Sequence, residues 1–199
     1  QGARGLFLPP VSVTYSRNLR AFHANHIALS DLNGDGIKDI IVGHEFGVTF
    51  FAGNSARVFV PKKASSGSNN GVTGMALIDV NLDNKLDVVH TRTDDSNISN
   101  MPVRVYYGDG TGGFPNQSEL PADTISGPGI VRVGDVRRMV AIHANDDGLQ
   151  DLLAWQSGYL WLMRQNGTGA FKLSGSPGSA LHILFADFTG DGLDDYVMW

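Results

Sequence analysis

A short acidic loop occurs four times in this chain and constrains its fold more than any other feature. The first copy, residues 31–39, reads DLNGDGIKD, with oxygen-bearing side chains at loop positions 1, 3, 5 and 9 and glycine at position 6. Calcium takes about six to eight oxygen ligands, and short Asp and Asn side chains can converge on it from a tightly wound loop. Gly36 permits the sharp turn that would bring in the carbonyl of Ile37. This loop therefore predicts a calcium site.

The other three copies start at residues 79, 143 and 187. The second copy keeps every oxygen ligand and has Asn84 at position 6, where Asn tolerates the left-handed backbone that the turn needs. The fourth copy has Thr189 at position 3, and the third has His143 at position 1, whose nitrogen is a poor calcium ligand. We expect three to four mainly structural calcium ions, held least firmly by the third loop. The predicted ligands, with the position-7 carbonyls included, are Asp31, Asn33, Asp35, Ile37, Asp39, Asp79, Asn81, Asp83, Lys85, Asp87, Asn145, Asp147, Leu149, Asp151, Asp187, Thr189, Asp191, Leu193 and Asp195.

The segments that flank each loop are short and apolar, as residues 27–29 and 40–42 are around the first one. An EF-hand would require Glu at position 12 and a helix on each side. Position 12 of the first loop is Val42, inside the apolar run. The unit is therefore expected to be strand, calcium loop, strand.

A third apolar segment and a glycine-bearing turn follow each of the first three loops, for example residues 48–51 and 103–107. Repeats of about 40–50 residues with four strands each are typical of propeller blades. No long stretch shows the 3.6-residue period of a helix. The prediction is an all-β propeller or propeller segment of four-stranded blades, with the calcium loop between strands 1 and 2 of each blade. The repeats are placed at about residues 23–71, 72–134, 135–179 and 180–199, with residues 1–22 as the tail strand of a blade.

The fourth repeat supplies only one strand after its loop before residue 199. A blade that lacks a strand would leave unpaired backbone groups beside apolar faces. We therefore expect the missing strands to come from a second chain, either another copy or the remainder of a longer precursor.

These loops and the apolar strand after each of them resemble the calcium-bearing propeller repeats of integrin α-subunits and the related FG-GAP and VCBS repeats of secreted proteins. After Val42 the chain has Gly43-His44-Glu45 where the integrin form has Gly-Ala-Pro, and residues 191–196 look more like VCBS repeats. Proteins with similar repeats include mushroom lectins, polysaccharide lyases and accessory modules of secreted hydrolases. The resemblance implies the propeller fold and calcium binding, and it implies almost nothing about activity.

Composition excludes several other classes. Eleven of the 20 acidic residues sit at loop ligand positions, and Lys and Arg are scattered, so no basic stripe supports nucleic-acid binding. No apolar run approaches the ~20 residues of a membrane span. The chain starts at Gln1 without Met and its loops suit calcium at extracellular concentration, so we expect secretion.

For catalysis, the sequence shows no nucleophile elbow, zinc motif or phosphate loop, so nothing in it selects an enzyme. Aromatic side chains are better candidates for a ligand-binding site, because sugar rings stack on aromatic faces. Trp155 and Trp199 both lie four residues after the last loop ligand, and Tyr159 and Trp161 lie on a third strand. These rings either bind a ligand or fill the space between blades. The leading prediction is recognition of glycans or glycoproteins; the alternatives are a segment of a secreted polysaccharide lyase or hydrolase, and a protein–protein adhesion module.

Overall fold

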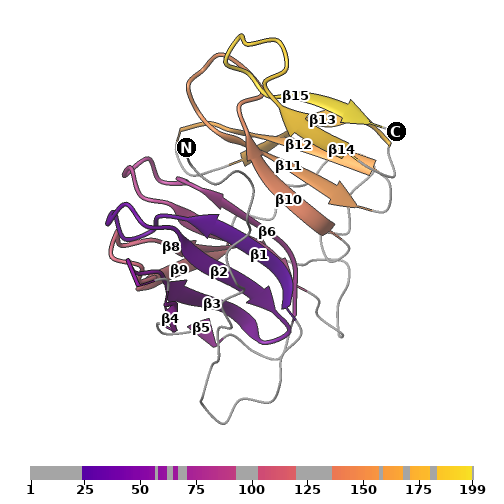
Figure 1. Cartoon of the computed structure of the whole chain (residues 1–199). Coiled ribbons are helices and arrows are strands. Elements are labelled where there is room, and N and C mark those ends of the chain that lie inside the picture. Colours follow the sequence, from indigo (N-terminus) through magenta and orange to yellow (C-terminus); the bar gives the residue numbers. More distant parts are fainter. Residues whose placement is uncertain are drawn as a thin grey trace, which may run out of the picture.

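The computed structural model of the chain describes residues 24–56, 58–61, 65–66, 71–92, 103–119, 136–156, 159–167, 171–179 and 183–198. The regular secondary structure of the described residues consists of antiparallel strands, arranged in successive sheets (Figure 1). No helix in this part of the chain is long and apolar enough to cross a membrane. The all-β prediction is confirmed. The predicted tail strand at 1–22 and Trp199 lie outside the described residues.

Four sheets follow one another in chain order, and each begins with a hairpin whose connection is one acidic loop. Sheet 1 contains β1 (Ala24–Ser30), β2 (Asp39–His44), β3 (Gly47–Ala52), β4 (Val60–Pro61) and β5 (Ser65–Ser66). Sheet 2 contains β6 (Val72–Ile78), β7 (Asp87–Arg92), β8 (Arg104–Tyr107) and β9 (Asn116–Glu119). Sheet 3 contains β10 (Val136–Ile142), β11 (Asp151–Gln156), β12 (Tyr159–Gln165) and β13 (Phe171–Ser179). Sheet 4 contains β14 (Ile183–Ala186) and β15 (Asp195–Met198).

The sheets pack face to face through apolar residues that alternate along their strands, as the two-residue period of a strand requires. Ile41, Phe50 and Val72 belong to the cluster between sheets 1 and 2, which are the lower sheets in Figure 1. Val89, Leu152 and Phe171 belong to the cluster between sheets 2 and 3. A smaller cluster between sheets 3 and 4 includes Leu153 and Phe185. Full burial of one such side chain contributes about 1.5–3 kcal/mol, so packing between sheets holds the arrangement together.

The first strand of each complete sheet starts with the same irregularity in its pairing with the second strand. The register shifts between Ala24 and His26 in β1, and at the corresponding places in β6 and β10. This repetition puts one equivalent cross-strand pair in each sheet, with both side chains on the same face. The pairs are His26 with Gly43, Gly74 with Thr91, and Arg138 with Trp155.

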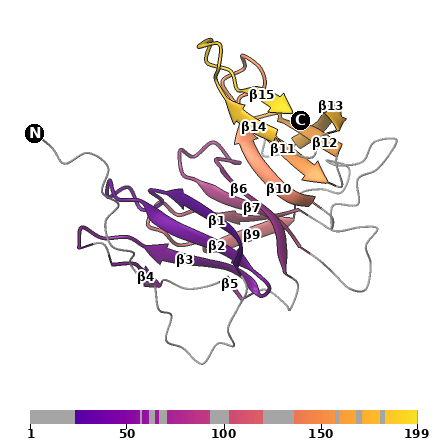
Figure 2. The same ribbon diagram turned by 45° about the vertical axis from the view of Figure 1, so that its right-hand side comes forward.

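The two outermost sheets leave apolar side chains exposed. Leu184 and Val197 face each other across the hairpin of sheet 4 and are 54% and 50% exposed. Ile27 and Leu29 on β1 are 66% and 62% exposed. The described residues do not close into a ring, as Figures 1 and 2 show. The described part of the chain therefore forms an open segment of propeller architecture.

Candidate functional site

The acidic loops are organised by their own carboxylates. In the first loop, Asp31 Oδ1 accepts hydrogen bonds from the amides of Gly34 (2.8 Å) and Asp35 (3.2 Å), and Oδ2 accepts one from Gly36 (2.8 Å). Asp79 and Asp187 bind the amides of their own loops in the same way. Third-loop His143 lacks such an acceptor pair. Position 1 is thus the centre of the turn in three of the four loops.

Position 6 has a left-handed backbone in every loop. Gly36, Gly148 and Gly192 have φ between 75° and 88°, and Asn84 has φ 62°. The prediction that Asn84 would take this conformation is confirmed. In the second loop Leu82 at position 4 also has φ 60°, where the first and fourth loops have glycine. A non-glycine residue pays a steric cost in this region, so the second loop is strained at Leu82.

The position-9 aspartates of the first three loops are fully buried, and those of the first two loops bind backbone amides through both carboxylate oxygens. Asp39 Oδ2 accepts from the amide of Leu32 (2.9 Å), and Oδ1 accepts from that of Gly53 at the end of β3 (2.8 Å). Asp87 makes the same two contacts with Val80 and Gly108. This carboxylate therefore fastens the loop to the third strand of its own sheet.

Burial and crowding set the pKa values of the loop carboxylates. The amide of Gly36 is the main cause that lowers the pKa of Asp31. Burial raises the pKa of Asp87, opposed by its amide partners, and the charges of Asp83 and Asp79 raise it further. Burial likewise raises the pKa of Asp151. Negative charge thus accumulates where the sequence predicts a cation.

The third loop contains oxygen atoms that fit a cation. Asn145 Oδ1 and Asp151 Oδ2 are buried and have no hydrogen-bond partner among the described residues. An unpaired buried carboxylate or amide oxygen costs free energy, and a hard divalent ion would remove that cost. No three His, Asp or Glu side chains in the described part of the chain form a metal-binding group by themselves. The ligand assignment therefore stays a prediction with which the loop chemistry is compatible.

Neighbouring sheets also hold the loops. Gln165 at the end of β12 donates through Nε2 to the carbonyls of Asp79 (3.0 Å) and Val80 (2.9 Å) in the second loop. In the fourth loop, Asp194 Oδ2 accepts from the amide of His143 (2.8 Å), and the amide of Asp194 donates to the carbonyl of His143 (3.0 Å). The loops of sheets 2 and 3 are thus each bound by the sheet that follows.

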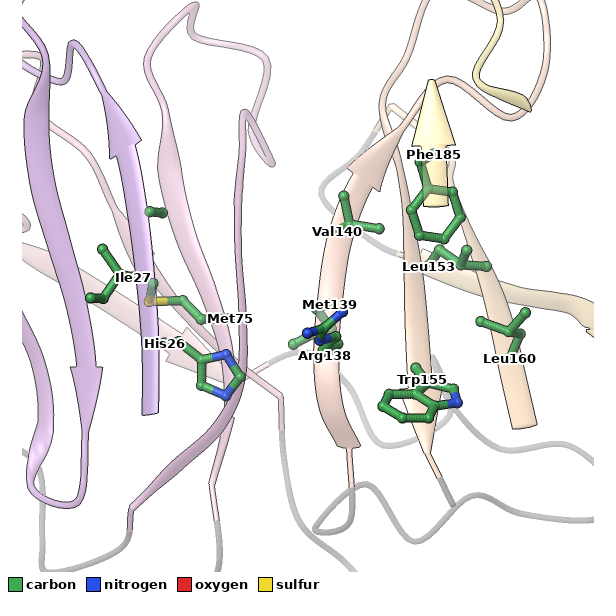
Figure 3. Close-up of a pocket in the computed structure, with 11 residues that line it drawn as sticks. His26, Ile27, Met75, Arg138, Met139, Val140, Leu153, Trp155, Leu160 and Phe185 are labelled. Atoms are coloured by element: carbon green, nitrogen blue, oxygen red, sulfur yellow. The ribbon is translucent and has the colours of Figure 1, made fainter. Parts of the chain in front are cut away.

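A cavity of about 290 Å³ lies around β10 and is lined by residues of β1, β6, β10, β11, β12 and β14. Figure 3 shows His26 and Ile27 on one side of it, Trp155 and Phe185 on the other, and Arg138 on the strand between them. The complete lining is His26, Ile27, Ala28, Met75, Arg138, Met139, Val140, Leu153, Trp155, Leu160 and Phe185. This mixture of an aromatic face, apolar walls and few polar groups is typical of small-molecule sites.

A second hollow, of about 510 Å³, lies beside the second acidic loop. Its lining includes the carboxylates of Asp83 and Asp109, together with Asn81, Tyr107 and Asn116. Asp109 Oδ1 is occupied by the amides of Thr111 and Gly113 and by the Thr111 hydroxyl. In this hollow two carboxylates stand beside one cation, Lys85, and its described lining has no tryptophan, in contrast to the cavity at β10.

The predicted ligand-binding aromatics are placed unequally. Trp155 is half-buried, packs against the cluster between sheets 3 and 4, and lines the β10 cavity. Its position is therefore compatible with both roles considered from the sequence, packing between blades and contact with a ligand. Tyr159 and Trp161 lie on β12, but their side chains are outside the described set, as is Trp199 entirely. Sequence reasoning missed His26 and Arg138, because only the cross-strand register reveals that they occupy equivalent places.

Comparison with known families gives one match. The model for FG-GAP-like repeats matches residues 31–90 and 144–198, which together make up more than half of the chain. No curated protein matches.

Several solved structures are similar. A lectin from Agrocybe aegerita, described as recognising non-reducing terminal N-acetylglucosamine, is 20% identical, with a TM-score of 0.57 over 86% of this chain and 46% of the lectin. The exotype rhamnogalacturonan lyase YesX is 18% identical (TM-score 0.46; 89% of this chain, 38% of the lyase). A Bacillus licheniformis rhamnogalacturonan lyase is 16% identical (TM-score 0.49; 89% and 40%). The chain thus spans less than half the length of each of these proteins, and the lectin supports the fold alone.

Proposed function

The chain belongs to the FG-GAP-like repeat family, and from this premise we propose that it is a carbohydrate-recognition module of a calcium-loaded β-propeller that works outside the cell. Recognition of a glycan or glycoprotein requires a binding surface and no reacting group. The lectin of Agrocybe aegerita with the same architecture recognises a terminal sugar, so propeller sheets of this kind can present such a surface.

The observation that carries the proposal is the half-buried indole of Trp155 in the wall of the β10 cavity. The cavity volume of about 290 Å³ is near the lower end for ligand pockets, which suits one or two sugar rings. An indole face packs against the apolar C–H face of a sugar ring, while polar groups at the edge bind its hydroxyls. Phe185 and Leu153 hold Trp155 in place, because they belong to the same cluster. The ring is therefore preorganised for stacking.

Calcium would support this surface from the acidic loops. The side chains and carbonyls at loop positions 1, 3, 5, 7 and 9 would hold it, and in the third loop the unpaired oxygens of Asn145 and Asp151 favour this assignment. Bound calcium neutralises clustered carboxylates and stabilises turns that would otherwise repel themselves. The acidic loops and the β10 cavity are distinct regions of the fold, so the proposed role of the metal is structural.

We also propose that other propeller sheets cover the exposed outer faces of sheets 1 and 4. The support is the exposure of Ile27 and Leu29 on one face and of Leu184 and Val197 on the other. Exposed apolar strand faces favour association with further strands. If a second copy of the chain covers these faces, light scattering should measure the mass of a dimer. A monomer of 21.3 kDa that stays folded and does not aggregate would contradict the proposal.

The test of carbohydrate recognition is a glycan array, followed by calorimetric titration of the best ligands in calcium buffer. Trp155→Ala is expected to reduce binding about fivefold to 150-fold, since loss of stacking on one ring costs about 1–3 kcal/mol on the scale seen for aromatic platforms. Phe188→Ala is the matched control, because Phe188 is an exposed aromatic of the fourth loop that does not line the cavity.

Two outcomes would contradict this function. Polysaccharide depolymerisation by the purified chain would favour the lyase or hydrolase alternative. Binding of a protein partner that Trp155→Ala leaves unchanged, with no glycan bound, would favour the adhesion alternative. The melting temperature of each variant shows whether a lost activity reflects a lost fold.

A further inference from the structure

The β10 cavity differs in charge from the rest of the chain. Its described lining contains Arg138 as the one permanently charged side chain and contains no Asp or Glu. The chain as a whole has 20 acidic residues and a formal charge of −5. A cationic cavity in an acidic protein attracts anionic groups selectively, because the acidic loops elsewhere repel them.

The pairing register places the charge beside the aromatic ring. Arg138 on β10 is directly opposite Trp155 on β11, so both side chains leave the same face of sheet 3. Cβ atoms of directly opposed residues are about 4.5–5.5 Å apart. Arg138 is exposed and makes no hydrogen bond or ion pair with any described residue. The guanidinium of Arg138 can therefore reach a sugar ring stacked on Trp155, and Arg138 gives up no hydrogen bond or ion pair with a described residue in doing so.

His26 adds a neutral acceptor on the opposite wall. Its Nε2 lies 2.7 Å from the carbonyl oxygen of Thr73, which can only accept, so Nε2 carries the proton and Nδ1 is an acceptor. Burial lowers the pKa of His26, and the nearby Arg138 lowers it further. His26 is therefore uncharged near neutral pH, and it can accept a hydrogen bond from a sugar hydroxyl.

From these contacts we propose that the β10 cavity binds the carboxylate-bearing residue of an acidic saccharide, a hexuronic acid, with the ring on Trp155 and the carboxylate on Arg138. The inference rests on the proposed carbohydrate recognition and narrows its ligand class. A guanidinium matches a carboxylate with two parallel N–H···O bonds, which a sugar hydroxyl cannot reproduce. The second hollow is less suited to the same ligand, because the one cation of its described lining, Lys85, is already paired with Asp83 at 3.3 Å and Asp109 adds a further carboxylate.

The experiment is a calorimetric titration of the calcium-loaded chain with three probes: oligosaccharides of glucuronic or galacturonic acid, the neutral oligosaccharides of glucose, galactose and N-acetylglucosamine, and acetate. We expect the uronic acid probes to bind at least tenfold more tightly than the neutral ones. Arg138→Gln is expected to weaken binding of the uronic acid probes about tenfold to hundredfold, the loss of a charge-assisted pair, and so to remove their preference over the neutral probes. Trp155→Ala is expected to weaken both.

Lys38→Gln is the matched control, since Lys38 is exposed, does not line the cavity, and its loss changes the net charge equally. Neutral sugars that bind as tightly as uronic acids, with dependence on Trp155, would overturn this inference and leave carbohydrate recognition intact. Acetate binding as tight as that of the uronic acids would overturn it as well, because the site would then be a simple anion site. Absence of binding by every saccharide would overturn both proposals. Arg138→Lys supplies a second variant: it keeps the charge but not the two parallel bonds, and should lose most of the preference.

Discussion

Replacement of Asp39 by alanine tests how the acidic loops are fastened to their sheets. The Asp39 carboxylate is fully buried and accepts the amides of Leu32 at 2.9 Å and Gly53 at 2.8 Å. Alanine would leave two buried N–H groups without an acceptor. Each such group costs about 1–3 kcal/mol, so Asp39→Ala should lower the free energy of unfolding by about 2–6 kcal/mol.

The matched variant is Asp195→Ala, at the same position of the fourth loop. Asp195 Oδ2 accepts the amides of Phe188 and Thr189, but both of these residues are exposed, so water can replace the carboxylate. The expected loss without metal is below about 1 kcal/mol, as for other surface substitutions. Each variant removes the predicted metal ligand at position 9 of its loop. The difference between their losses in free energy of unfolding therefore measures the effect of burying the amides.

Urea denaturation followed by circular dichroism, with excess calcium and with EDTA, gives the free energies. The difference between the two variants should persist in both buffers. Equal losses in EDTA would refute the reasoning, because the buried amides would then contribute nothing beyond the exposed ones. A loss for Asp39→Ala that vanishes in EDTA would show that this carboxylate acts only through the metal.

Three further predictions follow from the same loops and strands. Chelation should lower the melting temperature by many degrees, since a ligand of the native state at a hundredfold excess over Kd contributes about 2.7 kcal/mol per site; an unchanged melt after proven removal of metal would contradict this. Leu82→Gly should lower the free energy of unfolding by less than about 1 kcal/mol or raise it, because glycine relieves the backbone strain at φ 60°. A larger loss in thermal denaturation would contradict this prediction. Acidification from pH 7.5 to 5.5 should destabilise the fold, because burial lowers the pKa of His44, whose Nδ1 accepts a hydrogen bond from the amide of Phe46. The stability that neutral His44 contributes is complete above its unfolded pKa of 6.5 and is lost as the pH falls through the lower folded pKa. His44→Gln should flatten part of this dependence in urea titrations, the remainder belonging to His26, whose pKa is lowered in the same direction.

The fold could be predicted from the sequence because its information is local. An acidic loop between two apolar strands is readable within about twenty residues, and so is the left-handed position occupied by Asn84. The family match at residues 31–90 and 144–198 confirms the resemblance noted from the same motif.

The candidate site was predicted only in part, because it depends on pairing between distant residues. Trp155 stood out by its repeated position, but Arg138 became relevant only when the register placed it opposite that ring. Position 9 was read as a metal ligand, whereas the buried bonds of Asp39 add a second role that no spacing rule reports. Whether the side chains also bind calcium stays a prediction.

The hydrogen bonds that hold the second and third loops to the sheet that follows each of them have a consequence for synthesis on the ribosome. Gln165 is separated by 86 residues from Asp79, and Asp194 by 51 residues from His143. Contacts of such long sequence separation form late, since the intervening chain must be ordered first. The hairpin of sheet 2 therefore leaves the exit tunnel with its loop carbonyls unbound and is secured only after β12 has been translated. Maturation of this part of the module should run in the direction of translation, with sheet 3 securing the loop of sheet 2 and sheet 4 securing the loop of sheet 3.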